Sequence, residues 1–166
     1  METKITYRTI TYTYQSNYTP EQLWEFLVHP KYEVEFTKDP CYHNVIDENF
    51  TLEKGKVYTE VHTGKHCQGE NNPVKIVDVE EYKFYQIVRH GAGIKDTVTT
   101  TLQANKKGTV ITITSHFGFS LKSFNKPLHL ISWLLVATGL ATKLADEQVE
   151  QSYWFEKMEE KIERNE

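Results

Sequence analysis

The sequence predicts an α+β domain in which one antiparallel sheet packs against a long C-terminal helix. About 120 residues of mostly strand-like sequence come first, and strands at such short spacing require antiparallel neighbours. After Lys126-Pro127, a helical pattern then runs to Ile162 without a second proline. The length of 166 residues suits one domain with a substantial core, so residues 1–166 are expected to form a single ligand-binding unit.

The first predicted elements are a strand and two short helices. Thr alternates with Tyr and Ile between Ile5 and Ser16, which is the period of two that is typical of a strand. Thr19-Pro20-Glu21-Gln22 is typical of a helix start, with a capping threonine, a proline at the first helical position and a glutamine three residues after the cap. His29-Pro30 ends this helix, because the residue before a proline avoids the helical conformation. A second short helix is predicted over Lys31 to Lys38.

The middle of the chain consists of further strands. With the first strand they predict a sheet of about seven strands. Lys106-Lys107-Gly108 joins the last two as a hairpin. The additional strand candidates are Asn44–Phe50, Val57–Thr63, Val74–Val79, Phe84–Arg89, Asp96–Gln103 and Thr109–Phe119.

The C-terminal helix changes character along its length. Leu128 to Leu144 is apolar nearly all the way round, whereas Asp146 to Glu166 carries eight acidic and three basic residues, although the whole protein has a net charge of only −4. In the second half, Phe155, Met158 and Ile162 follow at spacings of three and four, so they share one helix face and are expected to hold it on the sheet. A helix of this kind over one sheet can enclose an apolar cavity.

Several motifs resemble those of a known superfamily. The stretch Tyr12 to Trp24 is similar to the opening of the SRPBCC (START-like) superfamily, because Pro20, Glu21 and Trp24 match its pattern and Leu23 replaces the usual valine. Gly55 stands where these proteins turn into their third strand, and Leu102 followed by Gly108-Thr109-Val110-Ile111-Thr112-Ile113 resembles their hairpin. With the terminal helix, the resemblance covers nearly the whole chain.

The resemblance implies the helix-grip fold, a curved antiparallel sheet wrapped around a C-terminal helix with a cavity between them. Members of the superfamily include polyketide cyclases and aromatases, plant-allergen-like carriers and lipid-transfer proteins. The resemblance therefore specifies a fold more narrowly than a function.

Side-chain alternation along the strands predicts which residues line the cavity. The apolar members of each strand are expected to face inward, because the opposite face of the last strands would bury several threonines and Arg89. A mid-helix glycine costs about 1 kcal/mol relative to alanine, which is tolerable where a ligand or the sheet comes close. The predicted lining residues are Phe84, Gln86, Val88, Val98, Thr100, Leu102, Ile113, Ser115 and Phe117 on the strands, and Leu135, Thr138, Gly139 and Thr142 on the helix.

The strand Val57–Thr63 leaves two alternatives. Apolarity places Val57, Thr59 and Val61 inward, but a polar ligand would invert the choice. The inward choice leaves the candidate acid–base residues outside the cavity, so catalytic residues stay unassigned and the sequence favours binding over catalysis. Those candidates are Tyr58, Glu60, His62 and Arg89.

Composition excludes several other classes of protein. The mild acidity disfavours a nucleic-acid partner. Two cysteines form no disulfide framework and the first residues have no apolar signal core, so a cytoplasmic protein is expected. Leu130 to Leu144 is shorter than the ~20 apolar residues of a membrane span, and membrane contact is not expected. Cofactor motifs are absent, and the cysteines and histidines lack metal-binding spacing, so neither a cofactor nor a metal is predicted. These residues are Cys41, His43, His62, His66 and Cys67.

Three functions remain. The first is binding or carriage of a small apolar molecule, such as a lipid, an aromatic or a polyketide-like compound, between the sheet and the C-terminal helix. The second is a cyclase or dehydratase acting on such a ligand. The third is a regulatory protein-interaction domain that uses the apolar half of the helix, which could equally form a homodimer.

Overall fold

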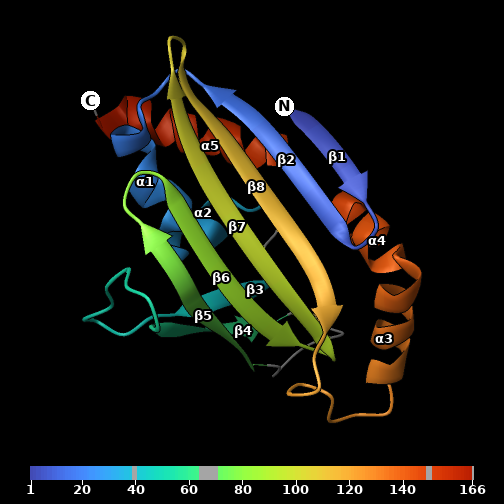
Figure 1. Ribbon diagram of the computed structural model, residues 1–166. Helices are drawn as coiled ribbons and strands as arrows, with labels where there is room; N and C mark the ends of the chain where they lie inside the picture. The colour runs from blue at the N-terminus through green and yellow to red at the C-terminus, as the bar shows by residue number, and fades with distance from the viewer. Residues whose placement is uncertain (39–40, 64–70, 149–150, 166) are drawn as a thin grey trace.

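The computed structural model describes residues 1–38, 41–63, 71–148 and 151–165, and within them forms one eight-stranded antiparallel sheet (Figure 1). The strands lie across the sheet in the order β1-β2-β8-β7-β6-β5-β4-β3. This confirms the predicted α+β helix-grip architecture. The strands are β1 (Glu2–Thr6), β2 (Thr9–Ser16), β3 (Tyr42–Val45), β4 (Val57–His62), β5 (Asn71–Glu80), β6 (Phe84–Gly91), β7 (Ile94–Asn105) and β8 (Gly108–Phe119).

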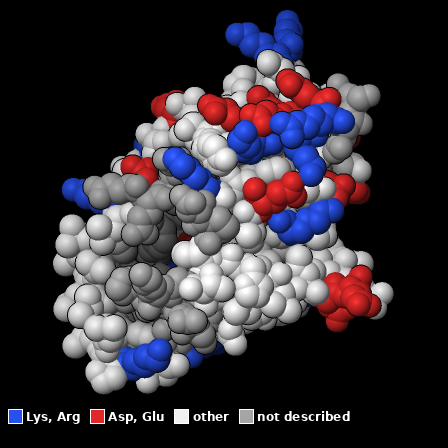
Figure 2. All heavy atoms as spheres, turned by 180° about the vertical axis from the view of Figure 1, so that it is seen from behind, with Lys and Arg blue, Asp and Glu red and all other residues white. Residues whose placement is uncertain are grey.

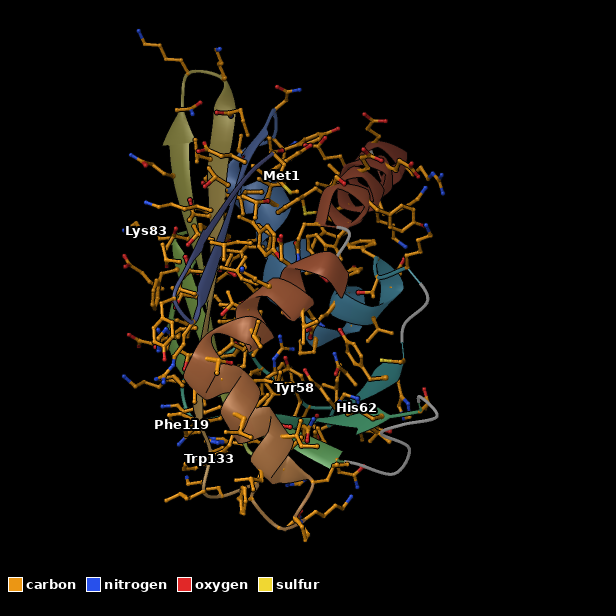
Figure 3. The ribbon with its side chains drawn as sticks, turned by 90° about the vertical axis from the view of Figure 1, so that its right-hand side faces the viewer. Met1, Tyr58, His62, Lys83, Phe119 and Trp133 are labelled. Carbon is orange, nitrogen blue, oxygen red and sulfur yellow. The ribbon has the colours of Figure 1, made fainter. Side chains whose placement is uncertain are left out.

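The helices cover one face of the curved sheet, which leaves its other face open. In Figure 3 the sheet is seen nearly edge-on, with the helices gathered on one side of it. The segments α3 and α4 run along the side of the sheet where β1 and β2 lie, and they lead to α5 (Figure 1). None of the described helices has the length and apolar character that a membrane crossing requires. The helices are α1 (Pro20–Val28), α2 (Pro30–Glu35), α3 (His129–Thr138), α4 (Leu140–Gln148) and α5 (Gln151–Asn165).

The start of α1 confirms the predicted capping signature. The Thr19 hydroxyl accepts a hydrogen bond from the Gln22 backbone N–H at 3.5 Å, and the Thr19 N–H donates to Gln22 Oε1 at 3.0 Å. Together with Pro20 at the first helical position, this reciprocal pair satisfies donors that a helix start otherwise leaves unpaired. The helix therefore begins where the sequence predicts.

The predicted first strand is divided into two. The chain turns at Tyr7 and Arg8, and Arg8 adopts a φ of 59°, so β1 folds back on β2 as an extra edge strand. Ile5 and Tyr7 stand at odd positions, whereas Ile10, Tyr12 and Tyr14 stand at even ones, so the alternation changes phase at the turn, and a single strand from Ile5 to Ser16 does not account for this change. The sheet accordingly has eight strands instead of about seven.

The predicted continuous C-terminal helix is also wrong, because α3 ends at Gly139. This residue has a φ of 74°, in the left-handed region that glycine adopts readily, and a Cβ there would lie 3.0 Å from the Tyr7 ring. The Tyr7 hydroxyl donates to the Ala137 carbonyl at 2.6 Å, and Arg8 Nε donates to the Val136 carbonyl at 3.1 Å. The turn between β1 and β2 thus satisfies the carbonyls that the end of α3 leaves free.

The core lies between the sheet and the helices α1, α2 and α5. Phe155, Met158 and Ile162 on α5 are all buried in it, which confirms the shared face predicted from their spacing. The Phe155 ring stacks on Tyr14 of β2 with the ring centroids 4.3 Å apart. The helix that grips the sheet is therefore the charged α5, the longest of the described helices, whereas the more apolar α3 lies along the side of the sheet near β1 and β2.

Candidate ligand-binding cavity

A cavity of about 780 Å³ opens between the concave face of the sheet and the helices that cover it. The strands β6, β7 and β8 form its floor, Tyr12, Tyr42 and Tyr58 reach it from β2, β3 and β4, and α1, α2 and the start of α5 form much of the rest. Its wall combines polar and charged side chains with apolar ones, and the apolar ones include Leu27, Val28, Pro30, Ile87, Val98, Ile113 and Trp154. Its size suits a drug-sized or lipid-like molecule.

The strand registers decide which side chains reach this cavity. Arg89 of β6 pairs with Asp96 of β7 and with Val74 of β5, so all three lie on the concave face. Tyr85 and Ile87 follow the same alternation and line the cavity with Arg89. On β4 the buried residues are Tyr58 and Glu60, while Val57 is exposed.

The inward residues predicted on β6 are therefore on the wrong face, and on β4, where two alternatives were open, the structure has the inverted one. Phe84 and Gln86 point to the outer face of the sheet, where the Gln86 amide donates to the Thr99 hydroxyl at 3.0 Å. Val88 lies on that face as well and borders a different cavity. The prediction treated a buried arginine as too costly, but Arg89 is compensated by carboxylates that come from three other elements.

The residues predicted to face inward on β7 and β8 do lie on the concave face of the sheet. Val98, Thr100, Ile113 and Ser115 line the cavity. Leu102 is buried in the core beside it, and Phe117 is half-buried on the same strand face without lining the cavity. Alternation of apolar residues predicted these strands correctly because, apart from Asp96, their inward positions carry no charged side chain.

The four helix residues predicted as lining do not line this cavity. Leu135 is half-buried, and Thr138 is exposed, with its hydroxyl donating to the Leu134 carbonyl at 2.8 Å. Gly139 forms the turn against Tyr7, and Thr142 is buried within α4. The break at Gly139 directs this part of the chain along the edge of the sheet, so its side chains do not reach the cavity.

A charged cluster occupies one end of the cavity. Arg89 Nε donates to Asp96 Oδ2 at 2.8 Å, and Arg89 Nη1 donates to Glu60 Oε1 at 2.9 Å and to Glu33 Oε1 at 3.3 Å. Three carboxylates thus share one guanidinium. His62 Nε2 lies 3.9 Å from Glu60 Oε2 and adds a positive charge only when it is protonated.

Glu33 is the carboxyl of this cluster that faces the cavity, and its side chain keeps 28% of its surface exposed. Its Oε2 accepts hydrogen bonds from the Asn44 amide at 3.2 Å and the Tyr58 hydroxyl at 3.4 Å. Burial raises the pKa of Glu33 above its usual value, more than the Arg89 guanidinium lowers it, and the charge of Glu60 raises it further. Glu33 can therefore hold a proton at a pH where an exposed glutamate has lost it.

Tyrosines surround this carboxyl. Tyr42, Tyr58 and Tyr85 line the cavity, and Figure 3 shows Tyr58 in the interior between the sheet and the helices. Burial, and then the charge of Glu33, raise the pKa of each phenol, so all three stay protonated and can donate hydrogen bonds. Tyr85 is 5% exposed, and its hydroxyl has no hydrogen-bond partner among the described residues.

The polar groups of the cavity therefore lie together at one end, around Glu33, and apolar side chains line other parts of its wall. The phenols and a protonated Glu33 can donate hydrogen bonds, and an ionised Glu33 can accept them or take up a proton. Arg89, Glu60, His62 and Tyr58 were predicted as candidate acid–base residues but were expected to lie outside the cavity. Glu33, Tyr85 and Asp96 were not predicted at all. For Asp96, the one available signal was that it could lie opposite Arg89 across a hairpin.

The cysteines and histidines form no metal site within the residues described. His66 and Cys67 lie outside those residues, and no group of three or more potential ligands is close enough elsewhere to hold a metal ion. Cys41 is an exposed free cysteine on the cavity wall.

Comparisons with known proteins support the fold. No protein-family model matches the chain, and no curated protein matches it in sequence. Among solved structures, protein MLL2253 from Mesorhizobium loti aligns with a TM-score of 0.59 at 19% identity, covering 96% of this chain and 99% of its own. Protein NE0264 from Nitrosomonas europaea gives a TM-score of 0.65 at 13% identity over 95% and 96%. Ara h 8.0201 gives 0.62 at 14% over 93% and 96%. At these identities, the likeness establishes a shared fold.

Proposed function

We propose that this protein binds or carries a small, mostly apolar molecule with an uncharged hydrogen-bonding group, held in the concave cavity. The observation that carries the proposal is the cavity itself, about 780 Å³, with apolar side chains along part of its wall and the buried hydroxyl of Tyr85, which has no hydrogen-bond partner among the described residues. A buried hydroxyl without a partner costs about 1–3 kcal/mol, and a ligand hydroxyl or carbonyl would recover part of that cost.

The charged cluster supports a ligand without a negative charge. Arg89 is already engaged by three carboxylates, so an anionic group near it would meet more negative than positive charge. The apolar side chains opposite the cluster favour a hydrocarbon or aromatic body. The resemblance to the SRPBCC superfamily supports the same general ligands, namely lipids, aromatics and polyketide-like molecules.

A pair of fluorescent probes tests this proposal. Pyrene and 1-hydroxypyrene share an aromatic body, and they differ by one hydroxyl. Both should bind the purified protein, and 1-hydroxypyrene should bind about two- to tenfold more tightly, which is the value of one net hydrogen bond. Changing Tyr85→Phe should remove this advantage and leave the affinity for pyrene unchanged.

A cavity-filling variant locates the binding site. Val98→Phe places a larger side chain in the cavity wall and should weaken the binding of both probes. Val110→Phe is the matched control, because Val110 is half-buried on the outer face of β8 and should leave binding unchanged. Equal loss in both variants, or no binding of either probe to the native protein, would refute the proposal.

An enzyme acting on such a ligand is a second candidate, favoured by Glu33. A glutamate with a raised pKa beside three protonated phenols is suited to proton transfer, as cyclisation and dehydration require. Native mass spectrometry of a retained ligand, followed over time, would reveal loss of water. Conversion by the native protein, with binding but no conversion in Glu33→Gln, would favour catalysis over carriage.

A further inference from the structure

A second cavity, of about 920 Å³, lies on the outer face of the sheet. Val57, Lys75 and Val88 pair across β4, β5 and β6 on the face opposite Arg89, and all three line this cavity. Its other wall is the loop of residues 120–128, between β8 and α3, at the lower end of the sheet in Figure 1. The sheet separates it from the concave cavity, so a ligand in one cavity does not contact the other.

The lining of this outer cavity is strongly basic. Lys75, Lys95, Lys122 and Lys126 line it together with His90 and His129, and no aspartate or glutamate is among its described lining residues. Lys75, Lys95 and Lys122 form no ion pair with any described residue. Such a concentration of uncompensated cations in a concave surface attracts an anion.

His90 reports the positive potential inside the cavity. Its Nδ1 lies 2.7 Å from the Ser120 hydroxyl, which fixes the imidazole against the loop. Burial and then the charges of Lys122 and Lys95 lower the pKa of His90. The two lysines therefore act on the same enclosed space, and a bound anion would reverse their effect on His90.

Large apolar side chains project from the same loop and from α3. Leu121 is 79% exposed and Leu128 is 69% exposed, beside Lys122 and Lys126 in the sequence. On α3, Leu130, Ile131 and Leu134 are each more than half exposed. Figure 2 shows few charged side chains at the lower left, the region of α3 and α4, whereas acids and bases gather towards the upper right. An apolar surface of this extent indicates a contact site.

The base of α3 is firmly attached, so these side chains are held outward. The Trp133 ring packs against Phe119 at the end of β8, with the ring centroids 4.4 Å apart, and His129 and Val136 are buried. Figure 3 shows the labelled Phe119 and Trp133 next to each other. The opposite side of the helix, with Leu130, Ile131 and Leu134, remains uncovered.

We propose that the loop 120–128 and α3 dock on an anionic phospholipid bilayer, with a headgroup phosphate in the basic cavity and the leucines among the acyl chains. Lysines beside exposed apolar side chains are the combination that an anionic membrane surface attracts. A two-fold dimer through this surface would instead set the uncompensated lysines of one copy against those of the other. The length of the apolar segment Leu130 to Leu144 argues only against a helix that spans the membrane, whereas this contact is peripheral. The contact is also independent of the ligand in the concave cavity.

Vesicle co-sedimentation tests the docking surface. The full chain should bind vesicles of equal parts phosphatidylcholine and phosphatidylglycerol, not vesicles of phosphatidylcholine alone, and added salt should weaken the binding. Each lysine near an anionic surface contributes about fivefold in affinity, so the double variant Lys95→Gln, Lys122→Gln should lose roughly 25-fold. Lys106→Gln, Lys107→Gln, in the β7–β8 turn at the other end of the sheet, should bind as the native protein does.

The apolar contribution needs its own variant. Leu121→Ser, Leu128→Ser should abolish sedimentation with the mixed vesicles, while Val45→Ser, an exposed apolar residue on β3, should not change it. All these side chains lie at the surface, so circular dichroism and melting temperature should show that each variant is folded.

Three results would overturn the proposal. The first is no binding to the mixed vesicles, or equal binding to both compositions. The second is binding of inorganic phosphate, followed through the His90 imidazole resonance, by a protein that does not bind vesicles, which would assign the cavity to a free anion. The third is a dimer in solution that the leucine changes separate, again without vesicle binding, which would assign the surface to a second copy.

Discussion

At the level of single residues, the informative feature is the shared guanidinium of Arg89. Alternation of apolar residues identified the concave face of β7 and β8 correctly, left β4 undecided and failed on β6. The failure has a physical cause, because Glu60, Arg89 and Asp96 stabilise one another only once three strands and α2 have come together. No rule based on one strand at a time can include a compensation of this kind.

Glu33 gives a prediction about the pH dependence of stability. Its pKa is raised above 4.5 in the folded protein, so its contribution to stability is fully present below pH 4.5 and is lost as the pH rises through the folded-state pKa. Glutamine does not titrate. The free energy of unfolding of Glu33→Gln, relative to the native protein, should therefore increase with pH over that window.

Urea unfolding at a series of pH values from below 4.5 to neutrality would measure this difference. Glu35→Gln on the same helix is the matched control, since the Glu35 carboxylate pairs with Lys161 at the surface, 2.8 Å away, and its replacement should bring no gain as the pH rises. A difference for Glu33→Gln that is flat or falls with pH would contradict the assignment of Glu33 as the carboxyl with the raised pKa.

At the level of elements, short sequence motifs predicted the features that depend only on neighbouring residues, namely a helix start and a hairpin turn. The capping box placed the start of α1, and Lys106-Lys107-Gly108 placed the hairpin between β7 and β8. The break at Gly139 depends on Tyr7 and Arg8, about 130 residues earlier in the chain. A glycine within a helical pattern costs only about 1 kcal/mol, which is too small a penalty to predict that the helix ends there.

The Phe155 side chain is expected to contribute much of the stability with which α5 packs on the sheet. Phe155 is fully buried and stacks on Tyr14, so Phe155→Ala should lower the free energy of unfolding by about 3–5 kcal/mol. The adjacent, exposed Glu156 provides the control, and Glu156→Ala should change stability by no more than about 0.5 kcal/mol. Chemical denaturation of both variants would measure the difference, and a loss below about 1 kcal/mol for Phe155→Ala would mean that α5 is not a gripping element.

At the level of the whole molecule, the buried tyrosines make the stability of the folded protein decrease at alkaline pH, because their phenols must ionise there. Burial, followed by the charge of Asp146, raises the pKa of Tyr12 to about 12, and the pKa values of Tyr42, Tyr58 and Tyr85 are raised as well. Stability from these groups is fully present below pH 10 and is lost as the pH rises above it.

We therefore expect alkaline unfolding in which part of the tyrosines ionise together with the loss of structure. Ultraviolet absorbance of tyrosinate and far-ultraviolet circular dichroism, recorded on the same samples, should show this shared transition. Complete ionisation of the tyrosines in a protein that keeps its native dichroism would show that the phenols are accessible to solvent in the folded state.

The order of strands in the sheet has a consequence for synthesis on the ribosome. β2 pairs along its whole length with β8, from Thr9 with His116 to Ser16 with Thr109. Until β8 has left the exit tunnel, β2 has no partner on that side, so Ile10, Tyr12 and Tyr14 lack their neighbouring strand, and Tyr14 also lacks the Phe155 ring of α5 that stacks on it. Pairing over such sequence separation is slow, so the nascent chain should spend most of its synthesis with these side chains open to chaperones, and gain its cavity only after α5 has emerged.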